Sequence, residues 1–284
     1  MATTSASSTA TAAAPARRAP APVRGRPPGF GAALRSEWRK FRALPSNRAI
    51  LAATAAMTVG ITVLMCVFGD TAALAREQAE GEYSVAFFGS YFGIWGFSAL
   101  AANVVAAEYR CGMISHTLAA TPRRWRVLAA KLVIIAVLAF ATGVAISFAG
   151  FGITQGVLAS AGERALDLGA PGMLRAVLLF VPVSMLAQSV LTACTAVLVR
   201  SAPAAVVLVI ALGTLPVVLA RFLDPWWGDT VPRYMAGAAA ESVAGLAVPG
   251  TPGYLPTLPA VLVIAVWLAV FTAVALTRFA RRDA

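Results

Sequence analysis

The residues best suited to ionic chemistry or recognition lie together in one polar island, EYRCGMISHTLAATPRRWRVLAAK (108–131), between two long stretches without charge. The island contains the carboxylate Glu108, the guanidinium groups Arg110, Arg123 and Arg124, and the only histidine of the chain, His116. These residue types can form ion pairs, but one histidine cannot supply the paired ligands of a zinc site. We therefore expect no metal centre here.

Motifs for catalysis or for ATP binding are missing from the sequence. A P-loop requires Gly-Lys-Ser/Thr, whereas Lys40 precedes Phe41 and Lys131 precedes Leu132. No Gly-x-Ser-x-Gly elbow is present, and Ser90 in FGSYFG does not have the required spacing. We expect no catalytic residue and no cofactor in this chain.

The elements that must position the island are membrane helices. Of the 284 residues, 59% are hydrophobic and only 12% are charged, against about 25% charged in soluble domains. A helix needs about 20 apolar residues to cross the hydrocarbon core. Six windows meet this requirement and predict an all-α integral membrane protein, with spans at about 49–69, 83–107, 127–154, 174–199, 203–221 and 259–278.

The basic residues predict the orientation of these spans. With both termini cytoplasmic, 18 Lys and Arg residues face the cytoplasm and 5 face outward, while nine of the twelve acidic residues lie outside. Short cytoplasmic loops retain Lys and Arg. We therefore predict a multi-pass membrane protein with both termini in the cytoplasm, whose net charge of +11 meets anionic lipid and not nucleic acid.

Charged residues deep within the spans are lacking, which argues against proton coupling, because transporters accept their cost of roughly 3 kcal/mol only for function. Lys131 is expected to snorkel to the interface from one to two turns inside its span. The uncharged polar residues Asn103, Gln155 and Gln188 could line a pathway or hydrogen-bond between helices. A sodium-driven carrier therefore remains an alternative interpretation.

Residues 1–29 are rich in Ala, Thr, Ser, Pro and Arg and predict a disordered cytoplasmic tail. The membrane domain then covers 30–284 and begins with an amphipathic interfacial helix, in which Leu34, Trp38 and Phe41 recur at i, i+4 and i+7. We expect the segment Pro45-Ser46-Asn47 to break this helix before the first span.

The long outer connection, 222–258, contains an Ala-rich segment, RYMAGAAAESVAGLAV (233–248), that carries Glu241. The segment is too short for a span and predicts one or two extracellular or partly re-entrant helices. Within the spans, Gly89 and Gly93 are four residues apart, as are Gly152 and Gly156, a spacing that favours close helix packing.

The island has its own local structure signals. Gly112 predicts a turn, and MISHTLAA (113–120) predicts a short helix with Met113, Ile114 and Leu118 on its apolar face. Such a short helix is marginal alone and needs a packing partner. Thr121 and Pro122 then predict the start of the next helix, with Thr as N-cap and Pro at the first position.

On these residues the chain resembles ABC-2 type permeases, the membrane-spanning subunits of bacterial ATP-binding-cassette exporters. EYRCGMISHTLAATPRRWRVLAAK is similar to their Glu-Tyr-Arg-x-Gly-Thr-Ile...Thr-Leu...Pro-Arg-Arg...Ala-Lys segment, with Met113 in place of the usual Thr. The six spans, LRSEWRKFRALPS (34–46) before the first span, the long outer segment and the closing RFARRD (278–283) also match the family outline.

The resemblance implies that 108–126 is a coupling loop that docks on a separate ATPase subunit. ATP and Mg²⁺ would be bound by that partner, and a second permease copy, identical or related, would complete the transporter. Met113, Ile114 and Leu118 would form the docking face, while Glu108, Arg110, Arg123 and Arg124 would hold the loop by ion pairs. Alternatives from the residues are an uncoupled channel or sodium-driven carrier, or a non-transporting membrane scaffold.

Overall fold

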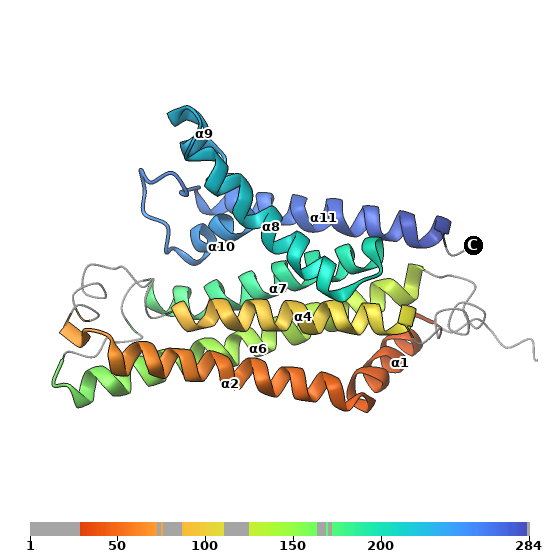
Figure 1. Ribbon diagram of the computed structural model, residues 1–284, viewed down its shortest axis with the longest axis horizontal. Coiled ribbons are helices and arrows are strands. Elements are labelled where there is room, and N and C mark those ends of the chain that lie inside the picture. The colour runs from red at the N-terminus through yellow and green to blue at the C-terminus, as the bar shows by residue number, and fades with distance from the viewer. Residues whose placement is uncertain are drawn as a thin grey trace, which may run out of the picture.

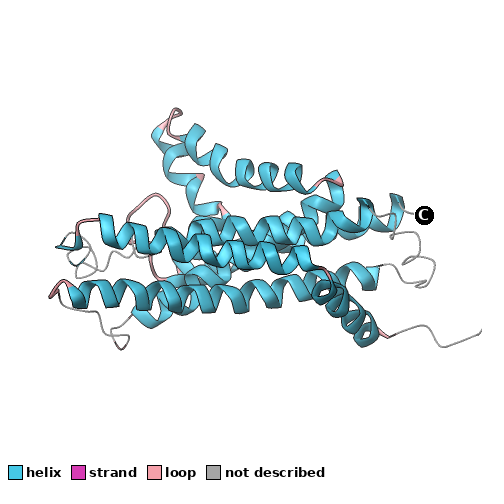
Figure 2. Ribbon diagram, turned by 60° about the horizontal axis from the view of Figure 1, so that its bottom comes forward, coloured by secondary structure: helices cyan, strands magenta, loops and turns pink. Residues whose placement is uncertain are grey.

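The computed structural model describes residues 29–72, 75, 87–110, 125–163, 169 and 172–282. The regular elements in these residues are helices, which Figure 2 shows in cyan with short connections in pink. They are α1 (Phe30–Ala43), α2 (Pro45–Phe68), α4 (Phe88–Arg110), α6 (Trp125–Ser160), α7 (Met173–Val199), α8 (Ala202–Ala220), α9 (Pro225–Thr230), the 3₁₀ turn η1 (Pro232–Tyr234), α10 (Ala236–Ala244) and α11 (Thr257–Arg282).

Six of these helices, namely α2, α4, α6, α7, α8 and α11, are long and apolar enough to cross a membrane. This agrees with the predicted number of spans and with a multi-pass membrane protein. Helix α6 runs from Trp125 to Ser160 and exceeds the predicted window of 127–154 at both ends. Its 36 residues correspond to about 54 Å at 1.5 Å per residue, so α6 extends beyond a single hydrocarbon core.

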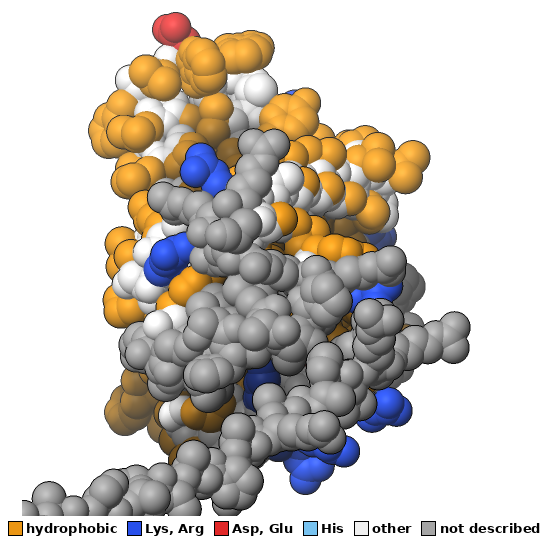
Figure 3. Space-filling view, turned by 90° about the vertical axis from the view of Figure 1, so that its right-hand side faces the viewer, with side chains coloured by type: hydrophobic (Ala, Val, Ile, Leu, Met, Phe, Trp, Pro, Cys, Tyr) orange, Lys and Arg blue, Asp and Glu red, His pale blue; other side chains and the backbone are white. Residues whose placement is uncertain are grey.

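The six helices alternate in direction, and the first and last described residues lie at the same end of the bundle (Figure 1). We call this the terminal end and the opposite one the far end. The terminal end contains α1, the end of α4, the start of α6 and the end of α11. Figure 3 looks onto the terminal end, where Lys and Arg side chains (blue) lie among hydrophobic ones (orange) around the grey atoms.

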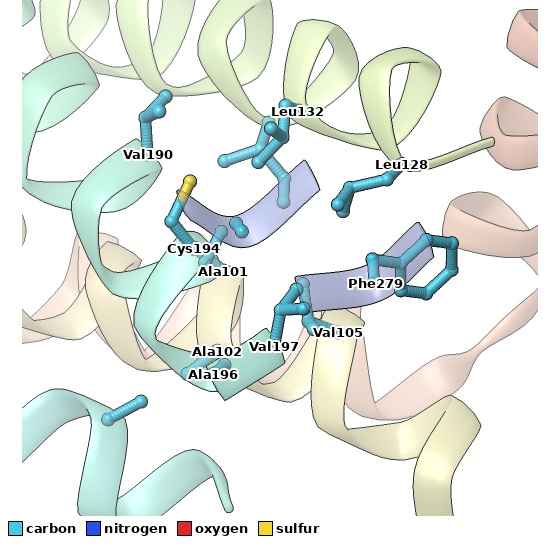
Figure 4. Close-up of a cluster of buried hydrophobic side chains, with 14 residues drawn as sticks. Ala101, Ala102, Val105, Leu128, Leu132, Val190, Cys194, Ala196, Val197 and Phe279 are labelled. Atoms are coloured by element: carbon cyan, nitrogen blue, oxygen red, sulfur yellow. The ribbon is translucent and has the colours of Figure 1, made fainter. Parts of the chain in front are cut away.

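Helix α7 is the centre of the bundle and α8 lies at its periphery. In the most apolar stretch of α7, 72% of the residues are buried, whereas in that of α8 only 11% are buried. In the half of the bundle nearer the terminal end, small and branched side chains from five helices pack together (Figure 4). The labelled members are Ala101, Ala102, Val105, Leu128, Leu132, Val190, Cys194, Ala196, Val197 and Phe279. The apolar side chains Val207, Leu215 and Leu219 of α8 instead point outward, as expected for contact with lipid.

The amphipathic helix α1 ends where Leu44 adopts an extended backbone. Pro45 does not extend the break as predicted from Pro45-Ser46-Asn47, because it occupies the first turn of α2, where its missing N–H has no partner to lose. The first span therefore begins at Pro45, four residues before the predicted start at Ala49. The sharp turn at Leu44 sets α1 at an angle to the first turns of α2 (Figure 1).

Helices α2 and α4 pack through small residues, as predicted for Gly89 and Gly93. A Cβ atom on Gly93 would lie 2.6 Å from the Thr58 Oγ1 atom, and one on Gly89 would overlap Thr62. Thr58 and Thr62 donate to carbonyl groups of their own helix, so the contact is hydrogen-bonded on its polar side.

The second predicted pair, Gly152 and Gly156, behaves differently. A Cβ atom at either position would have no heavy atom within 4 Å, and both residues are exposed. The predicted close packing is therefore not made by this pair within the described part of the chain. The two glycine pairs have the same spacing but only the pair in α4 packs closely, because spacing alone does not specify which face of a helix turns toward its neighbours.

Helix α8 leaves the bundle toward the far end, and the chain then returns through α9, η1 and α10 to α11 (Figures 1 and 2). The Trp267 Nε1 atom donates to the Tyr234 carbonyl at 2.9 Å. Trp267 is ten residues beyond the start of α11, about 15 Å along the helix. The η1 turn therefore lies beside the middle of α11, and the extracellular and re-entrant alternatives for 233–248 both stay predictions.

Candidate functional site: a buried ion pair and an apolar cavity

The predicted coupling loop connects α4 to α6 at the terminal end, because α4 ends at Arg110 and α6 begins at Trp125. Met113, Ile114, Leu118, Arg123 and Arg124 lie outside the described residues. Glu108 and Arg110 belong to the last turn of α4, where the backbone is described but their side chains are not. The roles predicted for these seven residues therefore stay predictions.

A buried ion pair next to this connection was not anticipated. Glu37 of α1 is 5% exposed, and its Oε2 atom lies 2.7 Å from the Nζ atom of Lys131 in α6. Its Oε1 atom accepts a hydrogen bond from Lys40 at 2.7 Å. One carboxylate thus binds two ammonium groups, one of them from the second turn of α6.

The ion pair changes the interpretation of Lys131. We predicted that this side chain would snorkel, but it is 5% exposed and binds Glu37 inside the protein. Burial of two charges is costly unless the geometry is good and the groups stay paired. The pair therefore fixes the position of α1 against the beginning of α6.

A sequence signal for Glu37 existed but was missed. Leu34, Trp38 and Phe41 were assigned to one apolar face, and Glu37 falls on the same face at i+3 from Leu34. An acidic residue on the apolar face of a basic helix needs a buried cation as partner. Lys131, the only lysine outside α1, was the candidate.

The polar residue Asn103 has an interhelix contact near the terminal end. Its Nδ2 atom lies 3.5 Å from the Oδ1 atom of Asn47, which is 1% exposed. The Asn47 Nδ2 atom in turn donates to the Phe41 carbonyl of α1 at 3.1 Å. Of the two uses predicted for Asn103, this geometry favours the hydrogen bond between helices.

A cavity of about 500 Å³ lies in the far half of the bundle, between α4, α7, α8, α11 and the returning segment η1–α10. Its described lining includes Gln188 from α7, but neither Asn103 nor Gln155. Gln155 is a half-buried residue of α6. The three polar residues predicted to share a pathway are therefore not brought together, and only Gln188 faces the cavity.

Glu241 of α10 is the acidic residue in the described cavity lining. Its Oε1 atom accepts a hydrogen bond from the Tyr91 hydroxyl of α4 at 3.2 Å. Burial raises the pKa of the Glu241 carboxyl, and the hydrogen bond from Tyr91 opposes this shift in part. The sequence had assigned Glu241 to the outer acidic residues, without indicating its contact with α4.

The position of Glu241 is set by Arg175 of α7, which holds the end of α10. The Arg175 Nε and Nη2 atoms donate to the Val243 carbonyl at 2.9 and 2.7 Å, and Nη2 also donates to Thr257 Oγ1 at 2.9 Å. Gly245 ends α10 with a φ of 79°, a left-handed conformation that glycine adopts without strain. The carboxylate is thus carried on an anchored element and not on a loose loop.

Within the described residues, no cluster of three or more His, Cys, Asp or Glu side chains could hold a metal ion. The described residues combine a buried ion pair at the terminal end of the bundle with a cavity in the far half. No known protein-family model matches the sequence. No curated protein matches it either.

Proposed function

We propose that this chain is the permease subunit of a type-2 ATP-binding-cassette exporter in a bacterial plasma membrane. The observation that carries the proposal is the polar island 108–131, which resembles the coupling segment of that family and connects α4 to α6 at the terminal end. A separate subunit would bind and hydrolyse ATP. A second permease copy would complete the pathway.

The topology supports this proposal. With six apolar helices in the described residues, α1, the end of α4, the start of α6 and the end of α11 lie at one end of the bundle, where the Lys and Arg bias predicts the cytoplasm. An ATPase in the cytoplasm would then meet the island directly. Asp70, Glu163, Asp224 and Asp229 belong to the connections at the far end, on the predicted outer side.

The buried ion pair offers a route for force from the island into the membrane. A helix docked through Met113, Ile114 and Leu118 would pull on the start of α6, to which Glu37 ties α1 through Lys131. Helix α6 is continuous to Ser160 and packs along α7, the centre of the bundle. To shift a two-state equilibrium from 1:99 to 99:1 takes about 5.5 kcal/mol, so this connection has to be stiff.

The test is co-purification of the tagged chain from its native host in mild detergent, with mass spectrometry of the bound proteins. We expect a stoichiometric P-loop ATPase that is lost when Met113, Ile114 and Leu118 are changed together to Ala. A matched control changes Phe222, Leu223 and Trp226 to Ala, because these apolar residues are 83%, 57% and 63% exposed at the far end.

Retention of the ATPase by the control and its loss from the island variant would support the docking face. If both variants retain the ATPase, Met113, Ile114 and Leu118 are not the docking face, but the ATPase is still a partner of the chain. A pure chain without any ATPase would refute the proposed function and favour a carrier or a scaffold. Ion flux in vesicles without ATP would then separate these two.

A further inference from the structure

We propose that the far-half cavity is a binding site for lipophilic organic cations, with Glu241 as the counter-ion and the surrounding aromatic rings as the apolar walls. This assignment names the substrate class of the exporter and in that sense rests on the proposed function. The site itself is defined within one chain and can be tested without an ATPase.

The chemistry of the walls carries the assignment. Four aromatic side chains line the cavity from three helices: Tyr91 and Trp95 from α4, Phe180 from α7 and Trp267 from α11. The Tyr91 and Phe180 rings meet edge to face with their centroids 5.8 Å apart. Aromatic faces attract cations by their quadrupole, more strongly where water is excluded.

The carboxylate supplies the charge that such a ligand requires. Glu241 is half-buried, lines the cavity and is oriented by the Tyr91 hydroxyl at 3.2 Å. A carboxylate buried among aromatic and aliphatic side chains pays for its desolvation only when a counter-ion is present. An empty site therefore favours the neutral carboxyl, and a bound cation favours the carboxylate.

The other charged groups around Glu241 do not provide that counter-ion in the described structure. Arg175 of α7 is engaged by the carbonyl groups at the end of α10 and by Thr257. Arg221 lines the cavity at the end of α8 and is exposed, so water screens its charge. From α4 the titratable neighbour is the Tyr91 hydroxyl, which donates to Glu241.

The size of the cavity suits a ligand of this kind. Its volume of about 500 Å³ lies within the range of roughly 300–1,000 Å³ typical of small-molecule sites. Besides Glu241, Arg221 and the hydroxyls of Tyr91 and Thr214, the amide of Gln188 and the hydroxyl of Ser184 add two hydrogen-bonding groups to a mostly apolar lining. The site therefore favours a bulky apolar cation over a small hydrated ion.

The experiment compares two ions of nearly equal shape and opposite charge, tetraphenylphosphonium and tetraphenylborate. Binding of each to the purified full chain in detergent is measured by equilibrium dialysis, with protein-free micelles subtracted. We expect saturable binding of the phosphonium alone. Glu241→Gln, which keeps the side-chain volume and an oxygen acceptor for Tyr91, should weaken it about ten- to hundredfold.

The control variant is Asp224→Asn, which makes the same carboxylate-to-amide change at an exposed far-end residue outside the described cavity lining. Its affinity for the phosphonium should stay within about threefold of the unaltered chain, since the charge is exposed and screened. Circular dichroism and thermal unfolding of each variant establish that it is folded. A Trp95→Leu variant gives a second reading, with an expected loss of about three- to tenfold from the missing cation–π contact.

The pH dependence identifies the group. The pKa of Glu241 is raised by burial, so phosphonium affinity should increase as pH rises through that pKa and level off above it. Tetraphenylphosphonium does not titrate, which leaves the protein as the source of the change. The Glu241→Gln variant should bind with the same low affinity across the pH range.

Three outcomes would overturn the assignment: equal binding of the two ions, equal phosphonium binding by the unaltered chain and folded Glu241→Gln, or an unchanged pH profile in that variant. If an ATPase co-purifies with a chain that shows one of these outcomes, the proposed function stands and the substrate class is wrong. If phosphonium binds as described and no ATPase is found, the cation site is supported and the proposed exporter function is wrong.

Discussion

Replacement of Glu37 by Gln should be the most damaging single change at the terminal end of the bundle. It removes one carboxylate that contacts Lys131 and Lys40, each at 2.7 Å, while it preserves the side-chain volume. The side chains of Glu37 and Lys131 are only 4% and 7% exposed. Solvent can therefore do little to compensate the cations for the lost charge.

The magnitude follows from the burial of each partner. Removing one member of a buried ion pair costs about 3–5 kcal/mol of unfolding free energy, which is the range expected for Glu37→Gln. The side chain of Lys40 is 27% exposed, and a partly solvated contact of this kind contributes about 0.2–1 kcal/mol. Lys131→Met should fall between the two, at about 1–3 kcal/mol, because Glu37 keeps its bond to Lys40.

The assay is unfolding of the purified chain in detergent or bicelles, followed by circular dichroism, for Glu37→Gln, Lys131→Met, Lys40→Met and the first two combined. The expected order of destabilisation is Glu37→Gln, then Lys131→Met, then Lys40→Met. The double-mutant cycle for Glu37 and Lys131 should give a coupling energy of about 1–3 kcal/mol. Additive effects, within about 0.5 kcal/mol, or a Glu37→Gln effect no larger than that of Lys40→Met, would show that the buried ion pair does not stabilise the chain as expected.

Four further changes test other parts of the structure. Gly143→Ala should destabilise the chain by about 1–3 kcal/mol through overpacking, because its Cβ atom would lie 2.6 Å from the Pro182 Cα atom. Gly152→Ala is the control on the same helix, because its Cβ atom meets open space. In the same unfolding assay it should be neutral or stabilising by up to about 1 kcal/mol. Asn47→Leu should cost about 1–3 kcal/mol, since it removes a buried donor to a backbone carbonyl of α1, and the loss should appear as faster proteolysis of α1. A cysteine at position 222, which is 83% exposed at the far end, should react with a membrane-impermeant maleimide in intact cells, and protection of that cysteine would contradict the predicted orientation.

The helical fold was predictable because membrane spans are specified by local composition. Long runs without charge require no knowledge of their neighbours, and all six predicted spans correspond to long helices. Boundaries were less certain where helix signals and charge signals disagree. Arg48 excluded the first turn of α2 from its charge-free window, although Pro45 and the residues after it are helical.

The contacts between helices were predictable only in part. The close approach at Gly89 and Gly93 followed from their spacing, but the same spacing at Gly152 and Gly156 falls on an exposed face. Which face of a helix turns inward depends on every neighbouring helix, and the sequence of one helix does not contain that information. The path of 233–248 beside the middle of α11 depends on long-range contacts of the same kind.

The polar residues, too, were predictable from the sequence only in part. Gln188 was recognised as a polar residue in a span, and it does line the cavity. The pairing of Glu37 with Lys131 joins residues 94 positions apart, and the bond from Tyr91 to Glu241 joins residues 150 positions apart. Glu37 carried a local signal, its position on the apolar face of its helix, whereas the segments of Tyr91 and Glu241 carried none, so only the folded arrangement reveals that second bond.

Docking of the polar island on an ATPase can be tested by site-specific photocrosslinking. A photoreactive phenylalanine analogue is placed at Leu118 in the native host, with the same analogue at Phe222 as the matched far-end control, and the crosslinked product is identified by mass spectrometry. We expect a P-loop ATPase joined to the chain at position 118 and none at position 222. Crosslinks from position 118 to lipid or to other membrane proteins alone would contradict it.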